Sequence, residues 1–74
     1  MRTIRISAGD VKDGKYVGAE AVVGVDAHIE IDASLGMVWF ANVNVAGRIV
    51  AKAGSGIEAG SGIKAGSGIK AGWG

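Results

Sequence analysis

Hydrophobic and polar residues alternate along most of this chain. From Val17 onward every odd position is apolar or small, and every charged residue after Tyr16 stands at an even position. A period of two belongs to an extended backbone that turns one face inward, whereas an amphipathic helix repeats its apolar residues every three or four positions. The pattern therefore predicts an all-β protein and excludes a helix over this stretch.

The odd-numbered row supplies the predicted core. Strands average ~5–6 residues before a turn resets the pattern, yet here the parity does not change. Hairpins would also show Asn-Gly or Asp-Gly turns, and none follows Val17. We therefore expect one continuous winding of the chain around these inward side chains: Ile29, Ile31, Leu35, Met37, Trp39, Val43, Val45, Ile49, Ile57, Ile63 and Ile69.

A short segment with a different register precedes this body. Its apolar residues stand at even positions, and the Asp13-Gly14 pair that follows is a turn signal. We predict one domain, because the chain is short. Its parts are a leading strand at 1–8, a loop at 9–16 and a β body at 17–74.

A six-residue repeat is superimposed on the alternation. Residues 51–74 read AKAGSG, IEAGSG, IKAGSG and IKAGWG. Period-six similarity is typical of a β-solenoid, in which successive coils stack. If three hexads make one coil, residues eighteen apart stack on one another. That spacing predicts two inner columns, one of Ala21, Trp39 and Ile57 and the other of Ala19, Met37, Ser55 and Trp73.

The hexads resemble those of hexapeptide-repeat β-helices. In that family an aliphatic residue is followed by a small or acidic one, two variable positions, a small residue and a variable one, and Ile57 to Gly62 matches this unit. Lys64, Lys70 and Trp73 depart from it. The periodicity also looks like that of bactofilin-type solenoids, which polymerise end to end. The resemblance implies a short β-solenoid, although a cross-β stack shares the alternation.

Composition adds a reason for self-association. The chain has 74 residues, 14 of them Gly, with no Pro and no Cys. So short a chain is usually marginal unless it is stapled or assembled, and it has no disulfide to staple it. Neither end of the repeat carries an evident cap, so we expect unpaired strand edges there. Our first hypothesis is a structural protein whose partner is itself, forming filaments or oligomers by end-to-end and lateral packing.

The charge and the lack of long apolar stretches argue against nucleic acid and membranes as partners. The net charge is +1, with a basic start, an acidic middle over 16–41 and a basic remainder, so nucleic-acid binding is not indicated. No apolar stretch is long enough for a membrane helix and no signal peptide is evident, so we expect a cytoplasmic or phage-derived protein.

Two outward sets of side chains are candidate sites. Asp26, His28, Glu30 and Asp32 alternate along one face, either as a solvated acidic face or as ligands of a divalent cation. One His without further motifs indicates neither an enzyme nor a cofactor. Outward apolar residues mark an interface or are covered by the leading strand. They are Val22, Val38, Phe40 and Val50, and Trp73 at the end of the repeat is a further candidate for an interaction.

These two sets support a second hypothesis. The acidic face and the apolar patch would be the contacts of a small, phage-type binding module that inhibits a host protein complex. Electrostatic complementarity of that kind favours specific partners.

Overall fold

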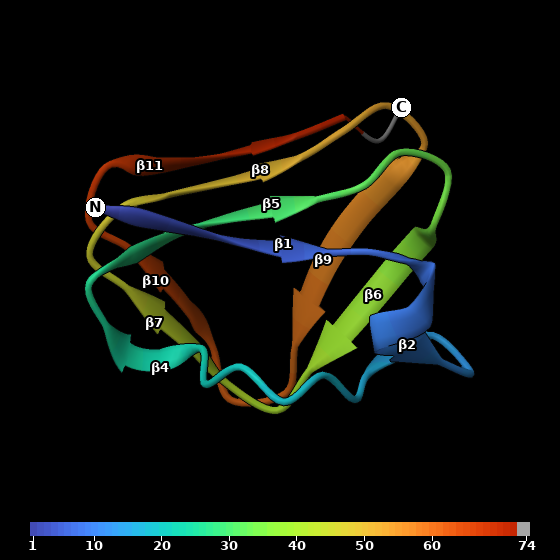
Figure 1. Ribbon diagram of the computed structural model, residues 1–74, viewed down its shortest axis with the longest axis horizontal. Helices are drawn as coiled ribbons and strands as arrows, with labels where there is room; N and C mark the ends of the chain where they lie inside the picture. Colours follow the sequence, from blue (N-terminus) through green and yellow to red (C-terminus); the bar gives the residue numbers. More distant parts are fainter. Residues whose placement is uncertain (73–74) are drawn as a thin grey trace.

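The computed structural model describes residues 1–72 and consists mostly of β-strands (Figure 1). This confirms the all-β prediction. Three sheets, here called A, B and C, surround a common core. The chain visits A, B and C in that order three times and then returns to A. No helix among the described residues is long and apolar enough to cross a membrane.

Sheet A is entirely parallel, with its strands in the order β1-β5-β8-β11. Its first strand lies within the leading segment predicted from the sequence, and it pairs as an ordinary member of the sheet. Ile4, Ile29, Ile49 and Ile69 stand in one register column. The strands are β1 (Arg2–Ile6), β5 (Ala27–Ile31), β8 (Arg48–Ala51) and β11 (Gly68–Ala71).

Sheets B and C complete the three-sided arrangement that Figure 1 shows in outline. Sheet C is parallel, in the order β10-β7-β4, and sheet B has the order β2-β3-β6-β9. The strands of sheet C are β4 (Val23–Val25), β7 (Val43–Val45) and β10 (Ile63–Ala65). Those of sheet B are β2 (Val11–Lys12), β3 (Lys15–Tyr16), β6 (Gly36–Phe40) and β9 (Ser55–Ala59).

The predicted loop at 9–16 is itself structured. A 3-10 turn, η1 (Ala8–Asp10), leads into a hairpin in which β2 runs antiparallel to β3. Asp13 and Gly14 form its turn with φ of 52° and 78°. A two-residue hairpin turn needs positive φ at both central positions, which Asp and Gly adopt readily. The hairpin makes sheet B mixed.

The spacing between stacked strands differs from the predicted eighteen residues. Ile29 pairs with Ile49 and Val43 with Ile63, both twenty residues apart. In sheet B, Val38 pairs with Ile57, nineteen residues later. The predicted columns are therefore wrong. Trp39, for example, stands beside Glu58 instead of Ile57.

The odd spacing in sheet B has a consequence for β6. When stacked strands are twenty residues apart, an odd-numbered residue stacks on an odd-numbered residue. When they are nineteen apart, an even-numbered residue stacks on an odd-numbered one. Val38 and Phe40 consequently point inward, and Met37 and Trp39 point outward. A one-residue change of register moves every side chain of a strand to the other face. The predicted orientation of this strand is wrong for that reason.

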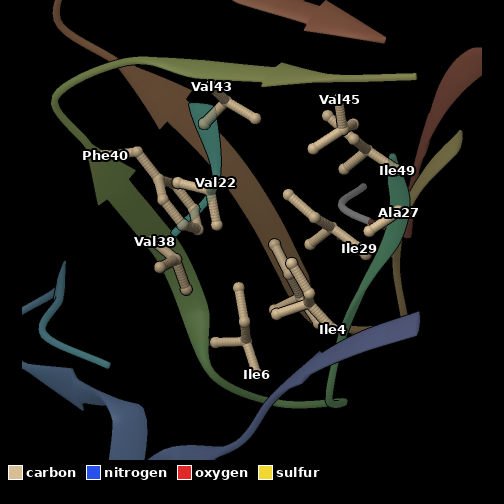
Figure 2. Close-up of a cluster of buried hydrophobic side chains, with 12 residues drawn as sticks. Ile4, Ile6, Val22, Ala27, Ile29, Val38, Phe40, Val43, Val45 and Ile49 are labelled. Carbon is tan, nitrogen blue, oxygen red and sulfur yellow. The ribbon is translucent and has the colours of Figure 1, made fainter. Parts of the chain in front are cut away.

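The core fills the space between the three sheets (Figure 2). Of the predicted core residues, Ile29, Ile31, Val43, Val45 and Ile49 are buried. Leu35, Ile57 and Ile63 are half-buried, and Ile69 is 49% exposed. Met37 and Trp39 are exposed on the outer face of sheet B, so their assignment to the core is wrong. The remaining buried hydrophobic residues are Ile4, Ile6, Val22, Ala27, Val38, Phe40 and Ala51.

Two glycines at corners of the chain, Gly47 and Gly66, stand where two layers of backbone nearly touch. A Cβ on Gly47 would lie 2.7 Å from the carbonyl oxygen of Ala27 in the strand beneath, and would also meet the His28 ring. Real Cβ atoms essentially never approach so closely. Gly66 lies against the backbone of Ala46 in the same way. Glycine is needed at these corners because any side chain would push the layers apart.

Candidate functional site

One end of the molecule exposes its apolar interior. We call it the open end: the outer edges of β9, β10 and β11 together with Ile57, Ile63 and Ile69. Within residues 1–72, no strand pairs with these three edges. Ile57 and Ile63 are half-buried and pack against the core, and the exposed Ile69 stands in register with the buried Ile49. The open end thus combines apolar surface with rows of backbone hydrogen-bonding groups, a combination that favours strand addition.

The opposite end is covered, contrary to the expectation that neither end is capped. We call it the capped end: β1, the β2–β3 hairpin, β4 and the chain around Val22. Ile4, Ile6 and Val22 are buried there. The Tyr16 ring stacks at 5.0 Å from that of Phe40, and its hydroxyl donates a hydrogen bond to the carbonyl of Glu20. Burial raises the pKa of that hydroxyl. The two ends therefore present different surfaces.

The predicted acidic candidates lie mainly on the outer face of sheet A, and three of them already have partners. Glu30 forms an ion pair of 3.0 Å with Lys52, and Asp32 forms one of 2.9 Å with Arg5. His28 accepts a 2.9 Å hydrogen bond at Nδ1 from the backbone N–H of Arg48. Asp26 is exposed. Among the described residues, no three acidic or His side chains are close enough to share a metal ion.

The Arg5–Asp32 pair should make stability depend on pH. Hydrogen bonding to the Arg5 guanidinium lowers the pKa of the Asp32 carboxyl below its ordinary value of 3.8. Because the pKa is lower in the folded state than in the unfolded state, the stabilisation is present above the ordinary value. It is lost as the pH falls through the folded-state value. We expect urea unfolding to show a stability that declines from about pH 5 to pH 2, and a shallower decline in Asp32→Asn.

Asp26→Asn is the matched control for this measurement, because Asp26 is exposed and lies on the same acidic segment. Its pH profile should follow that of the original chain. A profile of Asp32→Asn that coincides with that of the original chain would contradict the pairing.

Beside these ion pairs, the outer face of sheet A is shallowly hollowed. A hollow of about 230 Å³ is lined by Thr3, His28, Ile29, Glu30, Arg48 and Val50. A second hollow of about the same volume continues along β8 and β11. Small-molecule sites usually enclose more volume and bury most of their ligand. These two hollows are shallow and partly lined by charged side chains, and neither encloses a cavity of the size typical for a small molecule.

The predicted interaction residues are mostly interior. Val22, Val38 and Phe40 are buried, so their assignment to an outward interface, or to a patch covered by the leading strand, is wrong. Val50 is half-buried on the outer face of sheet A. Trp73 lies outside the described residues.

The outward pair that the alternation missed is Met37 and Trp39, which are 39% and 37% exposed on β6. The Nζ of Lys15 lies 5.8 Å from the centre of the Trp39 ring, and Glu58 stands beside Trp39 in the adjacent strand. Residues 37–41 are apolar at every position, so their pattern does not indicate which side of the strand faces inward. Only the stacking register in sheet B decides it.

Comparisons with protein-family models, with curated proteins and with solved structures found no match to this chain.

Proposed function

We propose that the chain is a short, three-sided β-solenoid that associates with copies of itself through the open end. The cyclic visiting order of the sheets and the parallel stacking at nineteen or twenty residues from β5 onward support the solenoid. The near-identical hexads place Ile57, Ile63 and Ile69 in sheets B, C and A respectively. In this arrangement each hexad forms one side of the three-sided coil that ends in β9, β10 and β11.

The observation that carries this function is the incomplete burial of Ile57 and Ile63 and the exposure of Ile69, beside three strand edges that no strand of residues 1–72 pairs with. Burying apolar surface contributes about 25 cal/mol per Å², which favours any partner of matching shape. The unpaired N–H and C=O groups of β9, β10 and β11 are satisfied best by a partner that has strand edges of its own. A second copy of the chain meets both requirements.

Replacing Ile63 by Lys is expected to abolish self-association, because it puts an uncompensated charge into the surface that must lose its water. Sedimentation velocity over a concentration series would show the original chain gaining mass while Ile63→Lys stays a monomer. Ile69→Lys is the companion variant. Its side chain is more exposed, so the change costs the fold less and separates loss of association from loss of folding.

Thr3→Lys is the matched control, since it adds the same charge on the outer face at the capped end. It should associate as the original chain does. Association of Ile63→Lys and Ile69→Lys with undiminished affinity would contradict the role of the open end. Circular dichroism shows whether each variant keeps its strands.

A binding module for a different protein is the second candidate. It is favoured by Met37 and Trp39, which expose apolar surface side by side with Lys15 and Glu58 at the rim. Exposed Trp surrounded by polar side chains is typical of interface centres. A partner that binds the monomer stoichiometrically and is lost in Trp39→Asp would favour this function. The acidic face contributes less, because Glu30 and Asp32 are already paired.

A further inference from the structure

We propose that self-association joins open end to open end about a two-fold axis and stops at two copies. The proposal rests on the function proposed above and names its geometry. The partner is a second copy of this chain, turned over, so that the strand edges of the two open ends pair antiparallel. Each copy then has only its capped end left, and growth cannot continue.

Stacking an open end on a capped end is disfavoured by the strands at the capped end. The edge of sheet B there is β2, which has two residues and runs antiparallel to its neighbour. Because β9 has five residues, most of its backbone groups would find no hydrogen-bonding partner on β2. The edge of sheet C is β4, whose register shifts between Val23 and Val25. Short and irregular edges of this kind protect a sheet against strand addition.

Charge disfavours the same stacking in sheet A. Arg5, Glu30, Val50 and Lys70 occupy one register column on its outer face. A copy added at the open end in the same sense would place its Arg5 against Lys70. Like charges directly opposite each other across a strand pair are destabilising. Of the apolar side chains at the capped end, Ile4, Ile6 and Val22 are already buried and add little on contact, whereas Val17 and Val23 are 58% and 51% exposed.

The open end carries one outward charge on each side, which restricts how two copies can meet. Glu58 stands on β9, Lys64 on β10 and Lys70 on β11. A two-fold axis across the end passes through one sheet, pairs its edge strand with its own copy, and exchanges the other two. Three arrangements follow, one for each sheet.

Two of the three arrangements place opposite charges together. With the axis through sheet A, Glu58 of each copy faces Lys64 of the other, and with the axis through sheet C it faces Lys70. With the axis through sheet B, Glu58 faces Glu58 while Lys64 and Lys70 face each other, so every cross-strand charge is repelled. Glu58 therefore selects the partner and is faced by a lysine of the second copy.

The size of the open end sets the strength of the contact. The molecule measures 25 × 23 Å across its three-sided outline (Figure 1). A triangle within that outline has roughly 300 Å² of flat area, so two open ends together bury about 600 Å² of it, which is below the range of stable interfaces and belongs to weak, transient contacts. We expect dissociation in the micromolar range, so the contact is sensitive to single charges.

The test is sedimentation velocity at ~1–500 μM and low salt, a range that brackets a micromolar dissociation constant. The monomer is 7.4 kDa, and the expected result is a limit at twice that mass. Mass that grows beyond two copies overturns the two-fold geometry and leaves the proposed function standing. A monomer at every concentration overturns the proposed function itself.

Charge variants test whether Glu58 faces a lysine of the second copy. Glu58→Lys should weaken the dimer on the order of tenfold by making all three sides repulsive, whereas Asp26→Lys makes the same charge change away from the open end and should not. Adding Lys64→Glu to Glu58→Lys restores the dimer if the axis passes through sheet A. Adding Lys70→Glu restores it if the axis passes through sheet C. Restoration by neither, with both double variants folded, overturns the proposal.

Discussion

Replacing Phe40 by Ala is expected to lower the free energy of unfolding by about 3–5 kcal/mol. Phe40 is 2% exposed and its ring lies 5.0 Å from that of Tyr16, between the core and the capped end. Removing it leaves a cavity that the surrounding strands fill only in part. A chain of this size has on the order of 5 kcal/mol of stability, so the variant should be largely unfolded at equilibrium in mild urea. Phe40→Leu, expected to lose about 1–2 kcal/mol, keeps the comparison measurable.

Trp39→Ala is the matched control, since it removes a larger ring from the next position of the same strand. Trp39 is outward and contacts Lys15 by a cation–π interaction, which is worth about 0.5–1 kcal/mol at an exposed site. Its loss should cost about 1 kcal/mol. Urea unfolding monitored by circular dichroism measures both variants. A greater loss for Trp39→Ala than for Phe40→Ala would show that β6 has the orientation the alternation predicts.

Replacing Ser55 by Ala is expected to cost about 2–3 kcal/mol, although it removes a single oxygen. Ser55 is fully buried. Its hydroxyl donates a hydrogen bond to the carbonyl of Asp32 and accepts one of 2.9 Å from the backbone N–H of Leu35. These bonds hold the corner between β5 and β6 to β9. Without the hydroxyl, both backbone groups lose a partner where water is partly excluded, which is the expensive way to lose a hydrogen bond.

Ser61→Ala provides a control from the same repeat. Ser55, Ser61 and Ser67 are each followed by Gly-Ile, but Ser61 and Ser67 are exposed. Ser61→Ala should change the free energy of unfolding by no more than about 0.5 kcal/mol. Thermal and urea unfolding of the two variants side by side measure the difference. Equal effects would mean that the Ser55 hydroxyl does not hold this corner.

The alternation was sufficient to predict strands and most inward positions. From β5 through β8 to β11 in sheet A, and from β7 to β10 in sheet C, it holds because stacked strands are twenty residues apart, an even number, so Ile29 and Ile49 keep one parity. It fails at β4, where the register with β7 shifts: Val22 is buried and Val23 is exposed. It fails in β6 because the step to Val38 is nineteen. The number of residues in the corners between strands decides whether stacked strands are nineteen or twenty residues apart, and these corner lengths are set by backbone conformation. They depend on residues such as Ser34 and Gly36, with φ of 63° and 72°, which a pattern of apolar and polar positions does not distinguish.

The candidate surfaces were predictable only in part. The repeat identifies Ile57, Ile63 and Ile69 as inward-facing, but inward-facing is not the same as buried. Whether an inward side chain is buried depends on whether a further layer of strands stacks on its own layer. The alternation of apolar and polar residues does not indicate this. The ion pairs of Arg5 and Lys52 join strands distant in sequence, so the acidic run at 26–32 gave no sign of its partners.

The capped end also has a consequence for synthesis. A ribosome releases the N-terminal part of a chain first, and domains generally begin to fold in that order. Here the hairpin and β1 leave before the strands that stack on them. The finished end is thus available as a template on which each later strand finds a ready edge. The unpaired edges of the three sheets at the growing end are the ones left exposed, and they move away from the start of the chain as translation proceeds.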